Sequence, residues 1–208
     1  MACGLSNSPE TGRATEVVVE QCLAALSDNG NDDSVDAAYV FFSPHHVHAV
    51  AEMSAIILRK LAPTHLIGIS TIASVGAATE LEKQPGISML AARMPGVTAV
   101  PFTSEDLPPA DENPETLARL AEAIGATDDH RFTLLLADPF SVPLVKMLPA
   151  LNKCRVGTSK GAIFGGMASA ANEAGGNALI LNDRVFRSGA VGLSLRGNIR
   201  VDTVVSQG

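Results

Sequence analysis

The sequence predicts an α+β fold, a mixed sheet that contains a βαβ unit, is flanked by helices and ends in an antiparallel β meander. First, two short apolar runs, AAYVFF and HLIGIS, enclose a stretch with helical periodicity. Second, two later segments combine apolar residues at helical spacing with capping residues. Third, residues 162–205 alternate short apolar runs with Gly and Asn-Asp turns, which is typical of antiparallel strands.

Composition and length indicate one globular domain over residues 1–208. Apolar residues make up 46% of the 208 positions and charged residues 18%, so the chain can bury a core without disulfides. The net charge is −7 with no basic run, and no stretch approaches the ~18 apolar residues of a membrane span. We therefore expect a cytoplasmic protein with neither nucleic acid nor membrane as a partner.

The sequence of the first half of the chain predicts a helix followed by the βαβ unit. Val19, Cys22 and Leu26 recur at helical spacing and indicate the first helix. Residues 37–42 form the first apolar strand, residues 47–61 a helical face, and residues 65–70 the second strand. A right-handed crossover makes these two strands parallel.

The middle of the chain predicts a hairpin, a loop and two helices. Residues 86–94 and 97–102 flank a Pro-Gly turn, which predicts that they pair as a hairpin. A proline-rich acidic surface loop spans 103–113. Asn113 and Pro114 are placed as N-cap and first residue of a helix that Gly125 closes. After a buried strand at 132–137, a helical face follows over 144–151, with Ser141 as its predicted cap.

Three histidines follow the first strand of the βαβ unit in the motif SPHHVH. Ser43 as N-cap and Pro44 as first helical residue put His45, His46 and His48 in the opening turn of a helix. The positive end of a helix disfavours imidazolium and offers free N–H groups to an anion. Only His45 and His48 share a face, and H-E-x-x-H is absent, so we predict no metal site. Exposed or capping histidines remain the alternative.

Other chemical motifs are incomplete. The stretch GTSKGAIFGGMAS lacks the spacing of a phosphate-binding loop, and Ser169 does not lie in G-x-S-x-G. Asp138 follows a buried strand, where it either accepts hydrogen bonds from nearby backbone N–H groups or contacts a ligand. We predict no cofactor and no catalytic residue set.

The turns after the apolar strands lie at one edge of a parallel sheet, where open sheets bind ligands. We therefore predict a polar ligand pocket there. The predicted ligand-binding residues are Ser43, His45, His46, Ser70, Thr71, Asp138, Ser141, Ser169 and Asn177. For Asn177, turn geometry is an equally good explanation.

Five motifs occur in this order along the chain: FFSPHH, HLIGIS, GISMLAARMPGV, LLADPFS and GGMASAANEAGGNALILNDRVFRSGAVGLSL. Together they resemble the FIST N-terminal domain, which is found in bacterial signalling proteins and some F-box proteins. The resemblance implies an intracellular sensory domain that binds small ligands, proposed to include amino acids, and signals to a partner. It also implies that the segment before Thr15 belongs to the domain. The chain departs from the family pattern at Ile69, where a small polar or thiol residue is common.

The family usually continues beyond VVSQG into a companion C-terminal domain, whereas this chain stops at Gly208. We expect either that domain or a signalling protein as partner, or self-association through the uncovered surface. Three functional classes stay open: a sensor of a small ligand such as an amino acid or carboxylate, a protein-interaction scaffold of F-box adaptor type, and an enzyme, hydrolytic or metal-dependent.

Overall fold

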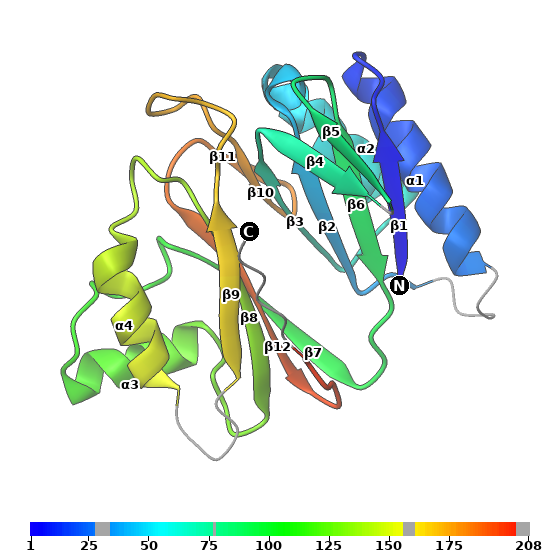
Figure 1. The fold of residues 1–208 in the computed structure, drawn as a ribbon. Coiled ribbons are helices and arrows are strands. Elements are labelled where there is room, and N and C mark those ends of the chain that lie inside the picture. The colour runs from blue at the N-terminus through cyan, green and yellow to red at the C-terminus, as the bar shows by residue number, and fades with distance from the viewer. Residues whose placement is uncertain (28–33, 77, 156–160, 203–208) are drawn as a thin grey trace.

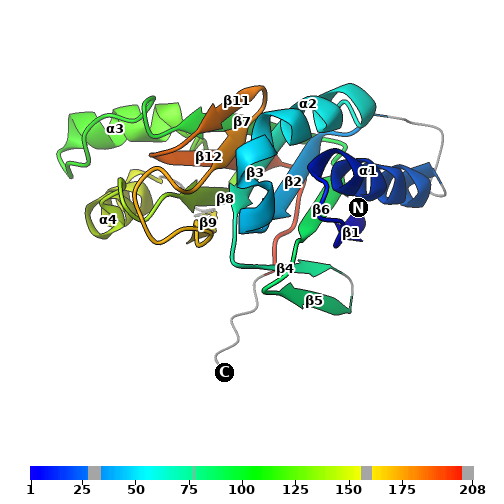
Figure 2. The same ribbon diagram turned by 90° about the horizontal axis from the view of Figure 1, so that it is seen from above.

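A computed structural model describes residues 1–27, 34–76, 78–155 and 161–202. It is built in four layers: a pair of helices, a six-stranded sheet, a four-stranded sheet and a second pair of helices (Figure 1). Seen from above, a two-stranded hairpin projects from the side of the larger sheet (Figure 2). This arrangement confirms the predicted α+β class.

The first sheet has the strand order β1-β6-β2-β3-β10-β11. Helices α1 and α2 cover its outer face (Figure 1). Strands β2 and β3 pair in parallel from Ala37 opposite His65 to Phe42 opposite Ser70, which confirms the predicted βαβ unit. The elements concerned are β1 (Ala2–Ser6), α1 (Thr11–Ser27), β2 (Ala37–Phe42), the 3-10 helix η1 (Pro44–Ala49), α2 (Val50–Lys60), β3 (His65–Ser70), β6 (Ile87–Ala92), β10 (Leu179–Leu181) and β11 (Arg184–Phe186).

The second sheet has the order β7-β12-β8-β9, in which only β8 and β9 are parallel neighbours. Helices α3 and α4 cover its outer face (Figure 1). The projecting hairpin consists of β4 and β5. The remaining elements are β4 (Ala73–Gly76), β5 (Thr79–Glu82), β7 (Val97–Thr103), α3 (Pro114–Ala123), β8 (His130–Ala137), α4 (Leu144–Cys154), β9 (Ala162–Met167) and β12 (Ala190–Gly197).

Three apolar clusters hold the four layers together. One fills the space between α1, α2 and the first sheet, and includes Val18, Met53 and Ile57. A second lies between the two sheets, and the third lies between the second sheet and helices α3 and α4. Burial of about 25 cal/mol per Å² of apolar surface makes these interfaces the main source of stability.

The predicted hairpin between residues 86–94 and 97–102 is wrong. β6 pairs with β1 and β2 in the first sheet, whereas β7 pairs with β12 in the second. The Pro95-Gly96 turn exists, with Gly96 at φ +76, but it carries the chain from one sheet to the other. Both flanking strands have buried faces. Each strand therefore pairs within the sheet in which that face is buried, and not with its neighbour in the sequence.

The C-terminal segment contains the predicted short strands, but they do not form one meander. β10 and β11 make an antiparallel hairpin, and Asn182 in its turn adopts φ +55, which asparagine tolerates. β9 instead pairs in parallel with β8, and β12 lies between β7 and β8. Residues 199–202 of the last expected strand are not in a strand, and 203–208 lie outside the described residues, as do 157–160 of the glycine-rich stretch.

Of the two predicted helix caps, one is confirmed and the other is wrong. Asn113 caps α3 as predicted, because its side chain accepts the Thr116 N–H at 2.8 Å. Ser141 does not cap α4: the N-cap position is Pro143, and the Ser141 hydroxyl donates to Asp138. No helix among the described residues is long and apolar enough to span a membrane.

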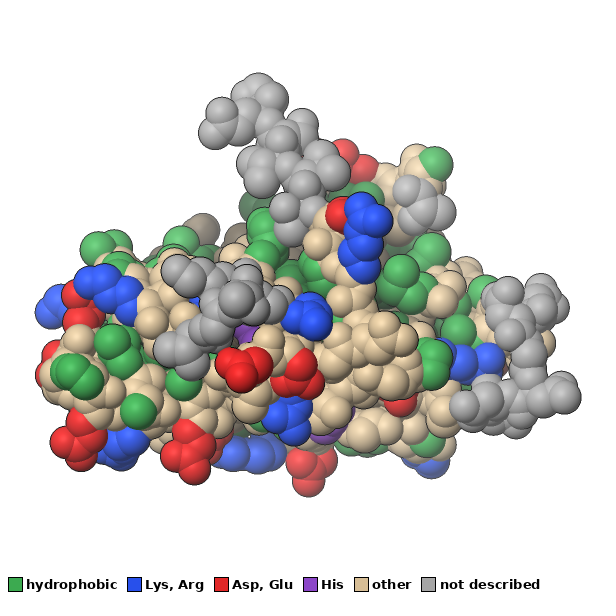
Figure 3. Space-filling view, turned by 90° about the horizontal axis from the view of Figure 1, so that it is seen from below, with side chains coloured by type: hydrophobic (Ala, Val, Ile, Leu, Met, Phe, Trp, Pro, Cys, Tyr) green, Lys and Arg blue, Asp and Glu red, His purple; other side chains and the backbone are tan. Residues whose placement is uncertain are grey.

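Seen from below, at the amino ends of the parallel strands, basic and acidic side chains are interspersed (Figure 3). The described part of this face therefore carries no continuous block of one charge.

Candidate functional site

The carboxyl ends of β2, β3, β8 and β9 lie along the upper edge of the two sheets (Figure 1). Both parallel pairs point the same way, so residues from two separate sheets meet there. Five of the nine predicted ligand-binding residues, Ser70, Asp138, Ser141, Ser169 and Asn177, form what we call the sheet-joining network.

Asp138 is the charged centre of this network. It is 1% exposed, and its Oδ1 accepts a hydrogen bond from Asn177 Nδ2 at 3.0 Å while its Oδ2 accepts one from Ser141 Oγ at 2.6 Å. Ser141 Oγ in turn accepts the Gly189 N–H at 2.8 Å. A buried carboxylate without such donors would be costly, so these bonds stabilise its position.

Ser70 and Ser169 connect the other pair of strand ends. Ser169 N donates to Ser70 O at 3.1 Å, and Ser169 Oγ accepts the Ile72 N–H at 3.0 Å. Ser70 Oγ accepts the Ala178 N–H at 3.0 Å. Ser70 is the last residue of β3 in the first sheet, and Ser169 follows β9 of the second, so the bond from Ser169 N to Ser70 O ties the two sheets together.

The other predicted residues lie outside this network. Ser43 Oγ accepts the Gly86 N–H at 3.0 Å and lies 3.3 Å from His45 Nδ1, which places both near the start of β6. Thr71 Oγ1 donates to Ala73 O at 2.7 Å. His46 is fully buried, with Nδ1 3.0 Å from Thr11 Oγ1 at the start of α1.

The histidine turn differs from the expected helix start. Pro44 is the first helical residue as predicted, but residues 44–49 form a 3-10 helix, and Ser43 makes no side-chain cap bond. The Ser43 hydroxyl oxygen instead accepts the Gly86 N–H. Burial lowers the pKa of His46 to about 4, and the neighbouring imidazoles of His45 and His48 add to this shift. His46 is therefore neutral at pH 7.

The nine residues are thus positioned mainly by bonds to one another and to the backbone. No group of three or more His, Cys, Asp or Glu side chains able to hold a metal ion occurs within the described ranges. Ser141, Ser169 and His45 are exposed, so the rim of this edge is accessible to a ligand.

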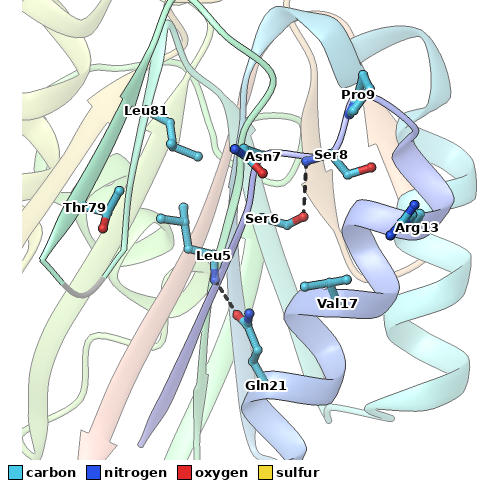
Figure 4. Close-up of a pocket in the computed structure, with 10 residues that line it drawn as sticks. All are labelled: Leu5, Ser6, Asn7, Ser8, Pro9, Arg13, Val17, Gln21, Thr79 and Leu81. Atoms are coloured by element: carbon cyan, nitrogen blue, oxygen red, sulfur yellow. Dashed lines mark hydrogen bonds between the residues drawn. The ribbon is translucent and has the colours of Figure 1, made fainter.

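An open groove of about 570 Å³ lies further along the same edge, beside the carboxyl end of β1. We call it the β1 groove. Helix α1 forms one wall and the β4–β5 hairpin the other (Figure 4). Its lining residues are Leu5, Ser6, Asn7, Ser8, Pro9, Arg13, Val17, Gln21, Thr79 and Leu81.

Among the described residues of that lining, Arg13 is the only charged one. Its side chain is exposed, and within the described part of the chain its guanidinium has no hydrogen-bond or ion-pair partner. Gln21 Oε1 accepts the Leu5 N–H at 2.8 Å, which leaves the Gln21 amide NH₂ facing outward in the groove (Figure 4). Free donors and one cation make the groove suitable for an anion.

None of the nine predicted residues lines the β1 groove, and sequence reasoning missed it. The segment MACGLS is too short and too weakly apolar to stand out as a strand, yet β1 pairs with β6 over five positions. The segment before Thr15 therefore contributes a strand to the first sheet. One available signal was the spacing of Arg13, Val17 and Gln21, which places them on one helical face.

Two uncharacterised proteins of Mycobacterium tuberculosis, from strains CDC 1551 / Oshkosh and ATCC 25618 / H37Rv, are similar to this chain. Each is 26% identical over 211 residues, which covers 99% of this chain and 50% of the relative. The chain thus spans about half the length of the curated relatives it matches. The sequence profile of the FIST N domain matches residues 36–208, from β2 through β12 and beyond. The chain therefore belongs to the FIST N domain family, a family of sensory domains in signal transduction.

Proposed function

We propose that this domain senses a small carboxylate, the class that includes amino acids, and that the carboxylate binds Arg13 in the β1 groove. The observation that carries the proposal is a guanidinium without a partner among the described residues, in a groove whose other described lining residues are uncharged. A planar guanidinium binds a carboxylate through two parallel hydrogen bonds.

The rest of the groove suits a small organic ligand. Leu5, Val17 and Leu81 supply apolar surface, while Asn7 and Gln21 supply amide donors. A volume of about 570 Å³ lies within the range of ~300–1,000 Å³ of ligand sites. Its walls come from α1 and the β4–β5 hairpin, so occupancy would act on two separate elements, which supports a sensory role.

Thermal unfolding with a reporter dye tests this proposal, since the chain has no Trp and one Tyr. Amino acids and simple mono- and dicarboxylates are titrated against the wild type, Arg13→Gln and the control Arg119→Gln, an exposed arginine on α3. A ligand at 100 times its Kd should add about 2.7 kcal/mol of stability to the wild type and the control. Equal stabilisation of Arg13→Gln would contradict the proposal.

The predicted residues at the strand ends are the alternative location. His45→Ala changes an exposed side chain there with little effect on packing. Loss of stabilisation in His45→Ala, with full stabilisation of Arg13→Gln, would move the ligand to the residues around His45 and the sheet-joining network.

A protein-interaction scaffold is the second candidate. The observation that favours it is a group of exposed apolar side chains beside α4 and β9: Phe140 is 47% exposed, Val145 89% and Met167 55%. Apolar groups of this kind mark interaction surfaces. This candidate would be favoured if no carboxylate stabilised the protein against thermal unfolding and if another protein bound stably through these residues.

A further inference from the structure

We propose that the carboxylate bound in the β1 groove is the C-terminus of an extended peptide, which pairs as an added strand with the outer edge of β1. This inference rests on the proposed function and names its ligand class. It is carried by the free edge of β1, by the placement of three side chains on α1, and by the charge of the groove.

β1 is an edge strand whose outer side is open. It pairs with β6 on one side, and no strand within the described ranges pairs with the other. The Leu5 N–H points away from β6, because it donates to Gln21 Oε1 at 2.8 Å. Backbone direction alternates along a strand, so the Cys3 N–H and C=O face the same open side.

The Gln21 side chain occupies the position of a neighbouring strand. Its amide oxygen accepts the backbone N–H that the carbonyl of an added strand would accept (Figure 4). Gln21 is exposed and lies on the surface of α1, so a peptide can displace it by a rotation of the side chain. The Leu5 N–H is thus satisfied in the free protein, and the edge remains open to an added strand.

Arg13, Val17 and Gln21 follow one another along the α1 face that lines the groove (Figure 4). Eight residues of helix separate Arg13 from Gln21, or about 12 Å at ~1.5 Å per residue. An extended peptide rises ~3.3 Å per residue, so three to four residues cover this length. A peptide paired at Leu5 therefore brings its end to Arg13.

The direction of this peptide is set by the position of Arg13. Arg13 lies in the first turn of α1, which follows the end of β1 through Ser8 and Pro9 (Figure 4). A peptide with its C-terminus there runs parallel to β1, and β-augmentation of this type is a common recognition mode. Val17 and Leu81 provide apolar contacts for one of its side chains.

The charge of the groove favours a peptide over a free amino acid. Its described lining residues include one cation and no Asp or Glu, so no carboxylate of that lining pairs with the ammonium of an amino acid. In a peptide the amino group lies several residues away from the carboxylate.

Fluorescence anisotropy with N-terminally fluorescein-labelled tetrapeptides ending in Ala, Val, Leu or Phe tests the inference. Each peptide is used as the free acid, as the C-terminal amide and with single N-methyl groups on its backbone. We expect at least one free acid to bind wild type and Arg119→Gln at least tenfold tighter than its amide. In Arg13→Gln, acid and amide should bind equally weakly.

The N-methyl series tests strand pairing without changing the protein. Methylation at alternate residues should abolish binding, because those N–H groups donate to β1, while methylation at the intervening residue should be tolerated. Equal affinity of all methylated forms, or of acid and amide, would overturn the inference.

The results also separate this inference from the proposed function. If free amino acids or simple carboxylates stabilise the protein through Arg13 but no peptide binds, the peptide inference fails and the proposed function stands. If neither class binds, both fail.

Discussion

At the scale of single residues, His46 and Asn177 show how far burial changes the chemistry of a polar side chain. His46 holds a neutral imidazole between the start of α1 and the 3-10 helix, and its Nε2 has no hydrogen-bond partner among the described residues. Asn177 is equally buried but fully engaged. The expected effects of changing the two residues therefore differ.

His46 makes the folding stability depend on pH. Its folded-state pKa of about 4 lies below the ordinary 6.5, so the unfolded chain binds a proton first as the pH falls. The stability that the neutral form provides is full above about pH 6.5 and is lost as the pH falls to about 4. His46→Gln should flatten this part of the curve of unfolding free energy against pH, measured by urea denaturation.

Burial also lowers the pKa values of His65 and His130, so some slope remains in the variant. His48→Gln is the control, since His48 is exposed. A slope in His46→Gln identical to that of wild type would show that His46 does not produce the effect.

Asn177→Asp should destabilise the sheet-joining network. The new carboxylate would lie about 3 Å from Asp138 Oδ1, where two buried negative charges repel. We expect a loss of roughly 3 kcal/mol at pH 7, recovered in part below pH 5 as the pair takes up a proton. The matched control is Asn172→Asp, an exposed asparagine of the same loop, which should change the unfolding free energy by less than about 0.5 kcal/mol.

At the scale of elements, the sequence predicted those structures whose signals are local. The βαβ unit and the start of α3 follow from apolar periodicity and from Asn113 and Pro114, and both are confirmed. The prediction of a β6–β7 hairpin was wrong, because a Pro-Gly turn specifies a change of chain direction but not the sheet that the next strand joins. The ends of β3 and β9 meet only because two sheets stack, and no local pattern encodes that contact.

Two adjacent glycines in β9 offer a direct test of the β8–β9 packing. A Cβ on Gly165 would lie 1.7 Å from Leu135 O, whereas a Cβ on Gly166 would meet nothing within 4 Å. Gly165→Ala should therefore cost about 1–3 kcal/mol, and Gly166→Ala less than ~0.5 kcal/mol. Urea unfolding of the two variants measures the difference, and equal costs would contradict the parallel pairing.

At the scale of the whole molecule, β9 is the exposed edge of the second sheet. Its sequence AIFGGM carries no charge or proline, the devices that usually protect an edge. Its last residue, Met167, is 55% exposed. We propose that this edge mediates the self-association expected from the sequence.

Sedimentation at tens of micromolar tests self-association. Wild type should sediment as a dimer, and Met167→Lys, which places a charge on the edge, should shift it toward the monomer. Lys146→Ala on the exposed face of α4 is the control. A wild-type monomer at this concentration would rule the proposal out.

The strand order has a consequence for how the protein is made. Four adjacent strands of the first sheet, β1, β6, β2 and β3, all lie within residues 2–92, whereas the second sheet is split in two without β12. During synthesis, β7 and β8 leave the ribosome well before β12, the strand that joins them. We therefore expect the second sheet to assemble only after residue 197 has emerged, later than the first four strands of the other sheet.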